Sequence, residues 1–311
     1  MPIVRANGMN IAYVENGDSA APAILLIMGL GMQLTAWPDA FCAGLADRGF
    51  RVVRFDNRDV GLSTKIRGAG KLALAAAFAR AMAGWPVAAP YLLADMAADA
   101  IGLMDAIGIE RAHIVGASMG GMIAQIIAAE RPERAVSLTS IMSSSGNPDL
   151  PRGDLRLIVA LAWPRLVFNR ERAIRQGMDF FRLIGSPGFP TSEEELRAKV
   201  ERSVDRCYYP AGMARQLLAI LASGSRVEML GRIRAPTLVL HGADDPLAPV
   251  EAGKDTADHI PGARLRIIAG MGHDMAPGLV PILIDAIAEH CTAAVRASER
   301  DHAAWSTGRA R

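Results

Sequence analysis

Short apolar runs recur along the chain, separated by longer stretches whose apolar residues follow helical spacing. We predict a strand in each apolar run: 23–29, 51–57, 112–117, 135–142, 236–242 and 263–270. The stretches between them, among them 91–109 and 119–130, are predicted to be helices. Because the runs are continuously apolar, the strands are expected to be buried on both faces. The pattern therefore predicts an α/β fold with a mainly parallel central sheet and helices on both faces.

The alternation opens with a predicted hairpin and has one long interruption. Residues 3–7 and 10–16 meet at Asn7-Gly8, a pair typical of a tight hairpin turn. From about residue 148 to residue 232 the sequence is helical and charged, and no run there requires a strand. The chain is expected to consist of four parts: core, 1–147; helical insertion, 148–232; core, 233–296; and a disordered tail, 297–311.

Composition narrows the classes of protein that the chain can belong to. Of its 311 residues 51% are hydrophobic and 21% are charged, which is typical of a globular protein. The net charge is +2, the two signs are interspersed, and no polybasic run occurs. We therefore expect no nucleic acid among its partners.

Targeting signals and cysteine usage indicate a cytoplasmic protein. The first ten residues lack the charged and long apolar segments of a signal peptide. The two longest apolar stretches, 72–108 and 155–168, are interrupted by prolines or charged residues, so no membrane span is expected. Cys42, Cys207 and Cys291 form neither a CxxC pair nor a disulfide framework, which favours a reducing compartment.

The stretch "GASMG", residues 116–120, matches the pattern G-x-S-x-G at the junction of a predicted strand and a predicted helix. A sharp turn there would hold Ser118 out of the sheet as a nucleophile, and Gly116 and Gly120 would permit close approach of strand and helix. The helix N-terminus would favour a developing negative charge. The alternative is that Ser118 only caps an ordinary helix.

A serine nucleophile needs a general base, and one histidine has a suitable position. His273 follows the strand predicted at 263–270, in the glycine-rich loop "GMGHDM" before the last helix. Loops at the carboxyl edge of a parallel sheet are where such side chains can meet. The other histidines fall in predicted strands, helices or the tail: His113, His241, His259, His290 and His302.

Three aspartates are candidates for the acid that orients the histidine. Asp244 and Asp245 follow the strand predicted at 236–242, and Asp149 follows another strand. The order Ser118, aspartate, His273 is the order of an α/β-hydrolase triad. Histidines, cysteines and carboxylates show no metal-ligand spacing, and we expect neither a metal nor an organic cofactor.

With these residues in place, the chain resembles the α/β-hydrolase superfamily over nearly its whole length. It is most similar to a branch of small bacterial serine esterases that includes aclacinomycin methylesterase. The resemblance rests on several motifs in order: "LLIMGLGMQLTAWPDAF", "VVRFDNRDVGLSTK", "HIVGASMGGMIAQIIA", "LTSIMSSSGNPDLP", "PTLVLHGADDPLAP" and "IPGARLRIIAGMGHDM".

The resemblance implies roles for particular residues. The family's spacing from a glycine to the catalytic aspartate selects Asp245. The backbone amides of Leu30 and Met119 are implied to form the oxyanion hole. Met28 stands where the family commonly has a histidine, so the hydrogen bonds that brace this loop must differ. In "DNRDVGLS", Arg58 and Asp59 are interpreted as structural.

Two apolar stretches have open interpretations. The insertion at 148–232 corresponds to the family's cap over the sheet edge. Within it, residues 155–168 are either a lid over an apolar substrate or a helix packed on the core. Residues 70–85 form either a second apolar helix near the pocket mouth or a surface for self-association, so a homodimer is one expectation.

We therefore expect a carboxylesterase that cleaves small to medium, largely apolar esters through an acyl-enzyme. The same triad would also serve a lactonase, a carbon–carbon bond hydrolase or a cofactor-free perhydrolase, which fold and triad alone do not separate. A small-molecule receptor without catalysis is an alternative from another class, and the complete triad argues against it.

Overall fold

The computed structural model describes residues 1–67, 72–151, 153–154, 156–157 and 169–308. Its centre is one eight-stranded sheet of order β1-β2-β4-β3-β5-β6-β7-β8. The strands are β1 (Ile3–Ala6), β2 (Met9–Asn16), β3 (Ala23–Ile27), β4 (Arg51–Phe55), β5 (Ala112–Ala117), β6 (Ala135–Ile141), β7 (Thr237–Gly242) and β8 (Arg264–Ile268). β1, β2 and β4 pair antiparallel, and every pair from β4 to β8 is parallel. The predicted hairpin and the mainly parallel sheet are thereby confirmed.

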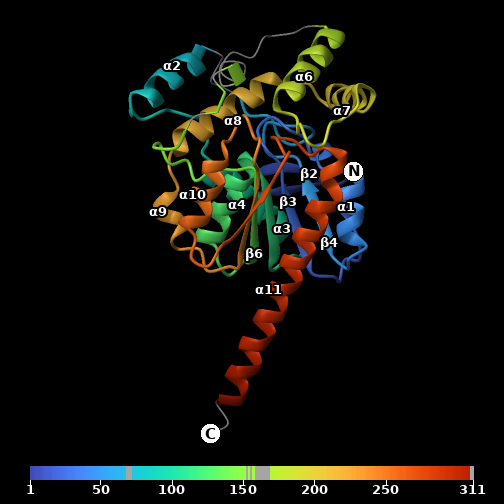
Figure 1. The fold of residues 1–311 in the computed structure, drawn as a ribbon, viewed down its shortest axis with the longest axis vertical. Helices are drawn as coiled ribbons and strands as arrows, with labels where there is room; N and C mark the ends of the chain where they lie inside the picture. The colour runs from blue at the N-terminus through green and yellow to red at the C-terminus, as the bar shows by residue number, and fades with distance from the viewer. Residues whose placement is uncertain (68–71, 152, 155, 158–168, 309–311) are drawn as a thin grey trace.

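Helices cover both faces of this sheet, as predicted (Figure 1). On one face, α3 (Leu93–Ala106) and α4 (Met119–Glu130) pack with the strands into one apolar cluster. On the other, α1 (Asp39–Ala46) and α11 (Val280–Gly308) contribute to a second cluster. α10 (Val250–Asp258) packs against β7 and β8. Strands β3, β5 and β7 are buried along their whole length, which explains their continuously apolar sequences.

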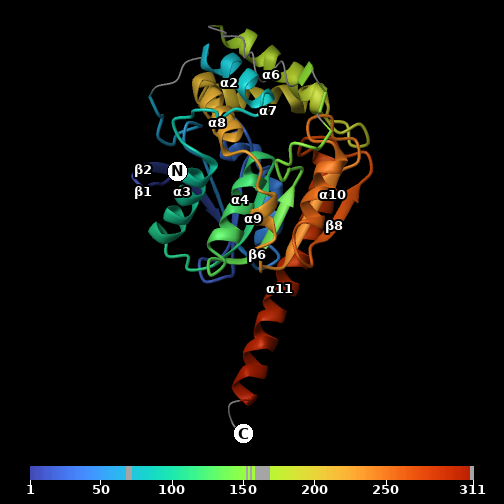
Figure 2. The same ribbon diagram turned by 90° about the vertical axis from the view of Figure 1, so that its left-hand side faces the viewer.

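Four helices lie together beyond one end of the sheet, at the top of Figures 1 and 2. Three come from the insertion: α6 (Arg170–Ile184), α7 (Glu193–Arg206) and α8 (Pro210–Ser223). The short helix α9 (Val227–Leu230) returns the chain to the core beside α4. We call residues 148–232 the cap.

The fourth helix, α2 (Leu72–Met82), belongs to the segment predicted as an apolar helix at 70–85. Its Leu74 and Ala77 pack against Leu217 and Leu218 of α8, so this apolar face is covered within the chain. The other apolar stretch, 155–168, lies almost entirely outside the described residues, and its two interpretations stay open.

α11 continues through residue 308 and projects beyond the core (Figure 1). The segment "ASERDHAAWSTG" contains no proline, and its three alanines favour helix after the apolar pattern ends. The disordered tail expected at 297–311 stays a prediction.

One helical stretch, Pro277–Arg296, has the length and mean hydropathy (1.5) of a membrane span. In this structure 56% of it is buried inside the protein. Its buried residues Leu283, Ile287 and Cys291 belong to the cluster beneath the sheet. A core helix of this kind meets the same criteria, so the stretch is weak evidence for a membrane.

Candidate active site

Ser118 lies at the sharp turn between β5 and α4 with φ 56° and ψ −121°, an unfavourable backbone conformation for a residue with a Cβ. The turn brings strand and helix so close that only glycine fits at its two flanks. A Cβ on Gly116 would lie 2.1 Å from the Gly120 carbonyl oxygen, and one on Gly120 would lie 2.0 Å from the Ile27 oxygen. The predicted strand–turn–helix context of Ser118 is thereby confirmed.

His273 reaches Ser118 from the loop after β8, 155 residues further along the chain. Its Nε2 lies 2.9 Å from the Ser118 Oγ, and its own backbone amide donates to the Ile184 carbonyl at the end of α6. His273 is 8% exposed, whereas Ser118 is partly accessible. A shielded imidazole thus contacts a hydroxyl that a substrate can reach.

Asp245 orients this histidine from the other side. Its Oδ2 lies 2.7 Å from His273 Nδ1, while its Oδ1 accepts hydrogen bonds from the backbone amides of Leu247 and Ala248. An ionised carboxylate can only accept, so His273 Nδ1 carries the proton and Nε2 is free to accept from Ser118. The Asp245 carboxylate is held at both oxygens and determines the tautomer of the His273 imidazole.

The two rival aspartates lie elsewhere. Asp244 is exposed and accepts a hydrogen bond from the Gly270 amide, which fixes the start of the histidine loop. Asp149 is exposed beyond β6. Of the three candidates, the structure brings only Asp245 to His273.

Another histidine, His241, lies near Asp245 but has a structural partner. Its Nε2 donates to the Ala248 carbonyl, and its Nδ1 has no partner among the described residues. Burial lowers the pKa of this imidazole, so it stays neutral beside the Asp245 carboxylate. His241 therefore helps to hold the turn that carries Asp245, and it leaves the Asp245 carboxylate free to accept from His273.

Leu30 and Met119, whose amides the resemblance implies as oxyanion donors, belong to segments next to Ser118. β3 ends beside the turn, with Ile27 paired to Gly116, and a Cβ on Gly29 would lie 3.1 Å from the Ser118 Cβ. Met119 follows Ser118 directly as the first residue of α4. Among the described residues neither amide has a protein acceptor. Unengaged backbone donors near a nucleophile can stabilise an oxyanion.

Arg58 and Asp59 have the structural surroundings that the resemblance implied. Arg58 forms a two-pronged ion pair with buried Asp99. Asp59 pairs with Arg215 of α8 and accepts a hydrogen bond from the Tyr91 hydroxyl. These contacts tie the loop after β4 to α3 and to the cap.

Two side chains that contact the loop after β3 were not singled out from the sequence. The Asn57 side chain donates to the Met28 carbonyl, and the Gln216 side chain accepts from the Gly31 amide. Gln216 is 185 residues away from Gly31 along the chain. No pattern in the sequence links Gln216 to Gly31, because their contact depends on how α8 lies on the core.

A search for metal-binding groups found no cluster of three or more histidine, cysteine or carboxylate side chains among the described residues. The three cysteines, Cys42, Cys207 and Cys291, are free thiols. The groups that the described site offers for chemistry are a serine hydroxyl, an imidazole, a carboxylate and backbone amides.

The comparisons with known proteins agree with this fold. A model of the α/β hydrolase fold family matches residues 22–276, and the chain belongs to this family. Rhodomycin D methylesterase from a Streptomyces species is 32% identical over 302 residues, which cover 89% of this chain and 93% of that protein. With such relatives, the chain is a hydrolytic enzyme of the esterase type.

Solved structures share the architecture at lower sequence identity. A meta-cleavage product hydrolase from Pseudomonas fluorescens superposes with a TM-score of 0.74 at 19% identity, over 94% of this chain and 98% of that one. An enol-lactonase from Burkholderia xenovorans gives 0.70 at 21% identity, over 94% and 100%. At such identities the likeness concerns the fold alone.

Proposed function

We propose that this protein is a serine esterase in which Ser118 is the nucleophile, His273 the general base and Asp245 the orienting acid. The observation that carries the proposal is the continuous chain of contacts from Ser118 Oγ to His273 Nε2 (2.9 Å) and from His273 Nδ1 to Asp245 Oδ2 (2.7 Å). The strained backbone of Ser118 supports it further, because such strain persists at functional turns.

The reaction follows from these contacts. His273 Nε2 takes the Ser118 proton while Oγ attacks the ester carbonyl, and the amides of Leu30 and Met119 receive the negative charge on its oxygen. The tetrahedral intermediate collapses as His273 protonates the departing alcohol, which leaves an acyl-enzyme. Water, activated by His273, then attacks the acyl carbonyl and releases the carboxylic acid and free Ser118.

The proposed substrates are small to medium, largely apolar carboxylic esters. Methyl esters are included, because two relatives at 32% and 30% identity are named as methylesterases. We further propose a cytoplasmic location, supported by the unpaired cysteines. The homodimer remains a prediction, and size-exclusion chromatography with light scattering measures it directly.

Hydrolysis of p-nitrophenyl acetate and butyrate tests the proposal. The wild type should turn over both esters, and Ser118→Ala should lose nearly all of this activity. A fluorophosphonate probe should add once, at Ser118. Labelling that persists unchanged in Ser118→Ala would refute the nucleophile. A wild type that shows no turnover, while a ligand still raises its melting temperature, would favour a receptor.

Lactone and carbon–carbon bond hydrolysis are the alternatives on the same triad. Relatives at 26% and 27% identity are named as hydrolases of 2-hydroxy-6-oxononadienedioate. Comparing kcat/KM for a methyl ester, an enol lactone and a vinylogous 1,5-diketone decides among them. A preference for the diketone above about 100-fold would replace the esterase proposal, since that factor equals about 2.7 kcal/mol of transition-state binding.

A further inference from the structure

The loop between β3 and the first turn of the next helix, residues 28–34, carries the proposed oxyanion donor Leu30. We call it the oxyanion loop. It contains Gly31 at φ +68°, a backbone conformation that favours glycine. One backbone hydrogen bond inside the loop and several contacts from outside it determine its direction.

Three successive peptide groups of this loop are held individually. The Met28 carbonyl accepts from the Asn57 side chain at 3.0 Å, and the Gly29 carbonyl accepts from the Met32 amide at 3.2 Å. Because a trans peptide directs its C=O and N–H to opposite sides, the Leu30 N–H points away from Met32. The next amide, Gly31 N–H, donates at 2.8 Å to the Gln216 side chain.

Gln216 comes from α8 of the cap and is completely buried. Its Oε1 accepts from Gly31, and its Nε2 donates at 2.8 Å to the Arg58 carbonyl. α8 itself lies directly on the core, since a Cβ on Gly212 would meet the Asp59 carbonyl oxygen at 2.0 Å. A cap side chain thus connects the oxyanion loop to the loop after β4.

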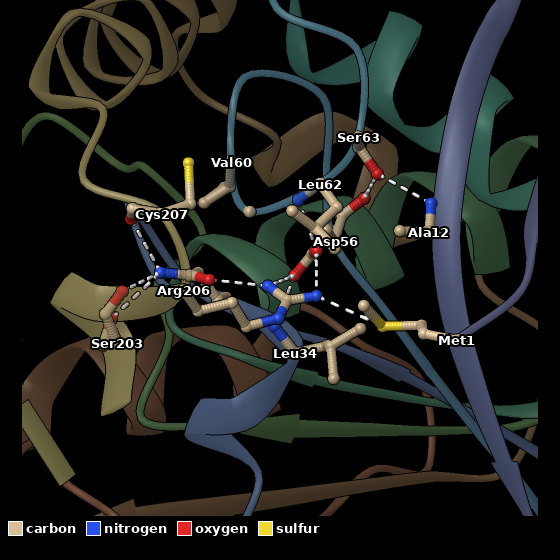
Figure 3. A network of polar contacts seen from close by, with 12 residues as sticks. Met1, Ala12, Leu34, Asp56, Val60, Leu62, Ser63, Ser203, Arg206 and Cys207 are labelled. Carbon is tan, nitrogen blue, oxygen red and sulfur yellow. Dashed lines mark hydrogen bonds and ion pairs between the residues drawn. The ribbon is translucent and has the colours of Figure 1, made fainter. Parts of the chain in front are cut away.

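The far end of the oxyanion loop is held by a second cap contact, shown in Figure 3. Arg206 of α7 contacts Gln33 Oε1 at 2.6 Å and Asp56 Oδ2 at 2.7 Å. Buried Asp56 also accepts from the Leu34 amide at 2.8 Å. The Gln33 Nε2 in turn donates to the Ser203 carbonyl at 2.7 Å. The middle of the loop, at Gly31, and its far end, at Gln33, are therefore both attached to cap helices.

We propose that Gln216 is a positioning residue for the oxyanion hole, so that this loop is held for catalysis by the cap rather than by the sheet core alone. This inference rests on the proposed serine esterase. It also accounts for Met28, whose side chain offers no hydrogen-bond donor: the bracing of the loop comes from Asn57 and from Gln216.

The test is Gln216→Met, which keeps the length of the side chain and removes both hydrogen bonds. We expect kcat for p-nitrophenyl butyrate to fall about tenfold or more, with KM within about twofold of the wild type, since a misdirected donor acts on the transition state. Phenylboronic acid, which forms a tetrahedral adduct with the serine oxygen, should lose affinity by a similar factor. Gln33→Met, which frees the other end of the loop, should change both quantities in the same direction.

Leu196→Ala is the matched control in the cap. Leu196 of α7 is buried in a cluster with Ile174, Met178 and Val200 that includes no residue of the loop, so its truncation should lower the melting temperature and leave kcat within about twofold. All variants are assayed below their own melting transitions.

The outcomes separate the two proposals. If Gln216→Met keeps wild-type kcat, or if Leu196→Ala loses as much kcat and boronate affinity, this inference is overturned and the proposed function stands. If the wild type itself shows no turnover that depends on Ser118, both fall.

Discussion

At Ser118 the chain holds a backbone conformation that glycine would adopt more easily. The φ of 56° costs a residue with a Cβ about 1–3 kcal/mol of conformational strain, and the packing of the surrounding turn offsets this strain. The strain directs the hydroxyl out of the sheet toward His273. Stability is thus given up at the residue that we assign as the nucleophile.

Replacing Ser118 by glycine should therefore stabilise the protein relative to Ser118→Ala. Both variants lack the hydroxyl, but only glycine relieves the strained φ, so we expect the free energy of unfolding to be about 1 kcal/mol higher for Ser118→Gly. Part of this gain is offset by the greater freedom of glycine in the unfolded chain. Urea denaturation of the pair measures the difference. A less stable glycine variant would show that the turn is unstrained.

Asp245→Asn should abolish most activity and leave the fold intact. The asparagine oxygen can still accept from the Leu247 and Ala248 amides, so its amide group would face His273 Nδ1. An N–H donor there forces the proton to Nε2, the wrong tautomer for accepting from Ser118. We expect kcat to fall about 10⁴-fold with an unchanged circular dichroism spectrum. Asp244→Asn is the control, since Asp244 contacts Gly270 and not the imidazole.

For single residues, the sequence identifies candidate site residues better than it identifies the contacts between them. Ser118 and His273 could be found because each follows an apolar run at a turn with glycines. Asp244 and Asp245 could not be separated by periodicity, because both follow the same strand, and only the family's spacing selected one. Gln216 gave no signal, since a buried glutamine in a helix resembles many others until its partner is known.

Among the elements, β3 and α4 show the closest approach near the site. A Cβ on Gly120 would lie 2.0 Å from the Ile27 carbonyl oxygen and 2.9 Å from that of Met28. Both neighbours are backbone atoms of the central sheet and its following loop, which cannot move aside independently. The helix can therefore begin directly after Ser118 only because this position has no side chain.

Gly120→Ala should accordingly destabilise the protein, by about 3 kcal/mol, through overpacking of α4 against β3. It should also reduce esterase activity, because Met119 begins α4 and Leu30 lies in the loop that follows β3, and these two elements are forced apart. Gly231→Ala provides the comparison: its Cβ would meet nothing closer than the Glu228 oxygen at 3.9 Å. Thermal denaturation of both variants is the measurement. Equal melting temperatures would contradict the close packing.

The core elements could be predicted because their periodicity reflects burial. β5 and α4 have the predicted bounds, and the other core strands agree within two residues at each end. The helix between β3 and β4 begins only at Asp39, because Pro38 lies at its start as the N-cap. The packing of α2 on α8 could not be read from either helix alone, since an apolar face does not specify its partner.

For the molecule as a whole, two buried histidines limit stability in acid. His113 in β5 and His290 in α11 are 1% and 2% exposed. Burial, with smaller contributions from nearby positive charges, lowers the pKa of each to about 4. They are neutral in the folded protein, and in the unfolded chain they bind protons below about pH 6.5.

Stability should therefore fall as pH decreases from about 6.5 toward 4, because the unfolded state then binds more protons than the folded state. Each histidine contributes about 1.4 kcal/mol per pH unit, so the pair should cost about 4 kcal/mol at pH 5 relative to pH 7. Urea denaturation between pH 7 and pH 5 measures this slope. His113→Gln, which cannot titrate, should give a slope about half as steep. An unchanged slope in that variant would assign the effect to other groups.

The loops that carry the proposed base and the proposed oxyanion donor are both tied to the insertion: Ile184 accepts from the His273 amide, and Gln216 accepts from the Gly31 amide. Caps in such enzymes are attractive units for recombination, since they can be excised at two points and exchanged between relatives to alter substrate range. Here an exchanged cap would also replace the residues at positions 184 and 216, which hold the His273 loop and the oxyanion loop. A chimera that takes only residues 148–232 would need residues 28–34 and 270–274 from the same parent, so the evolutionary unit of specificity in this chain is three segments instead of one.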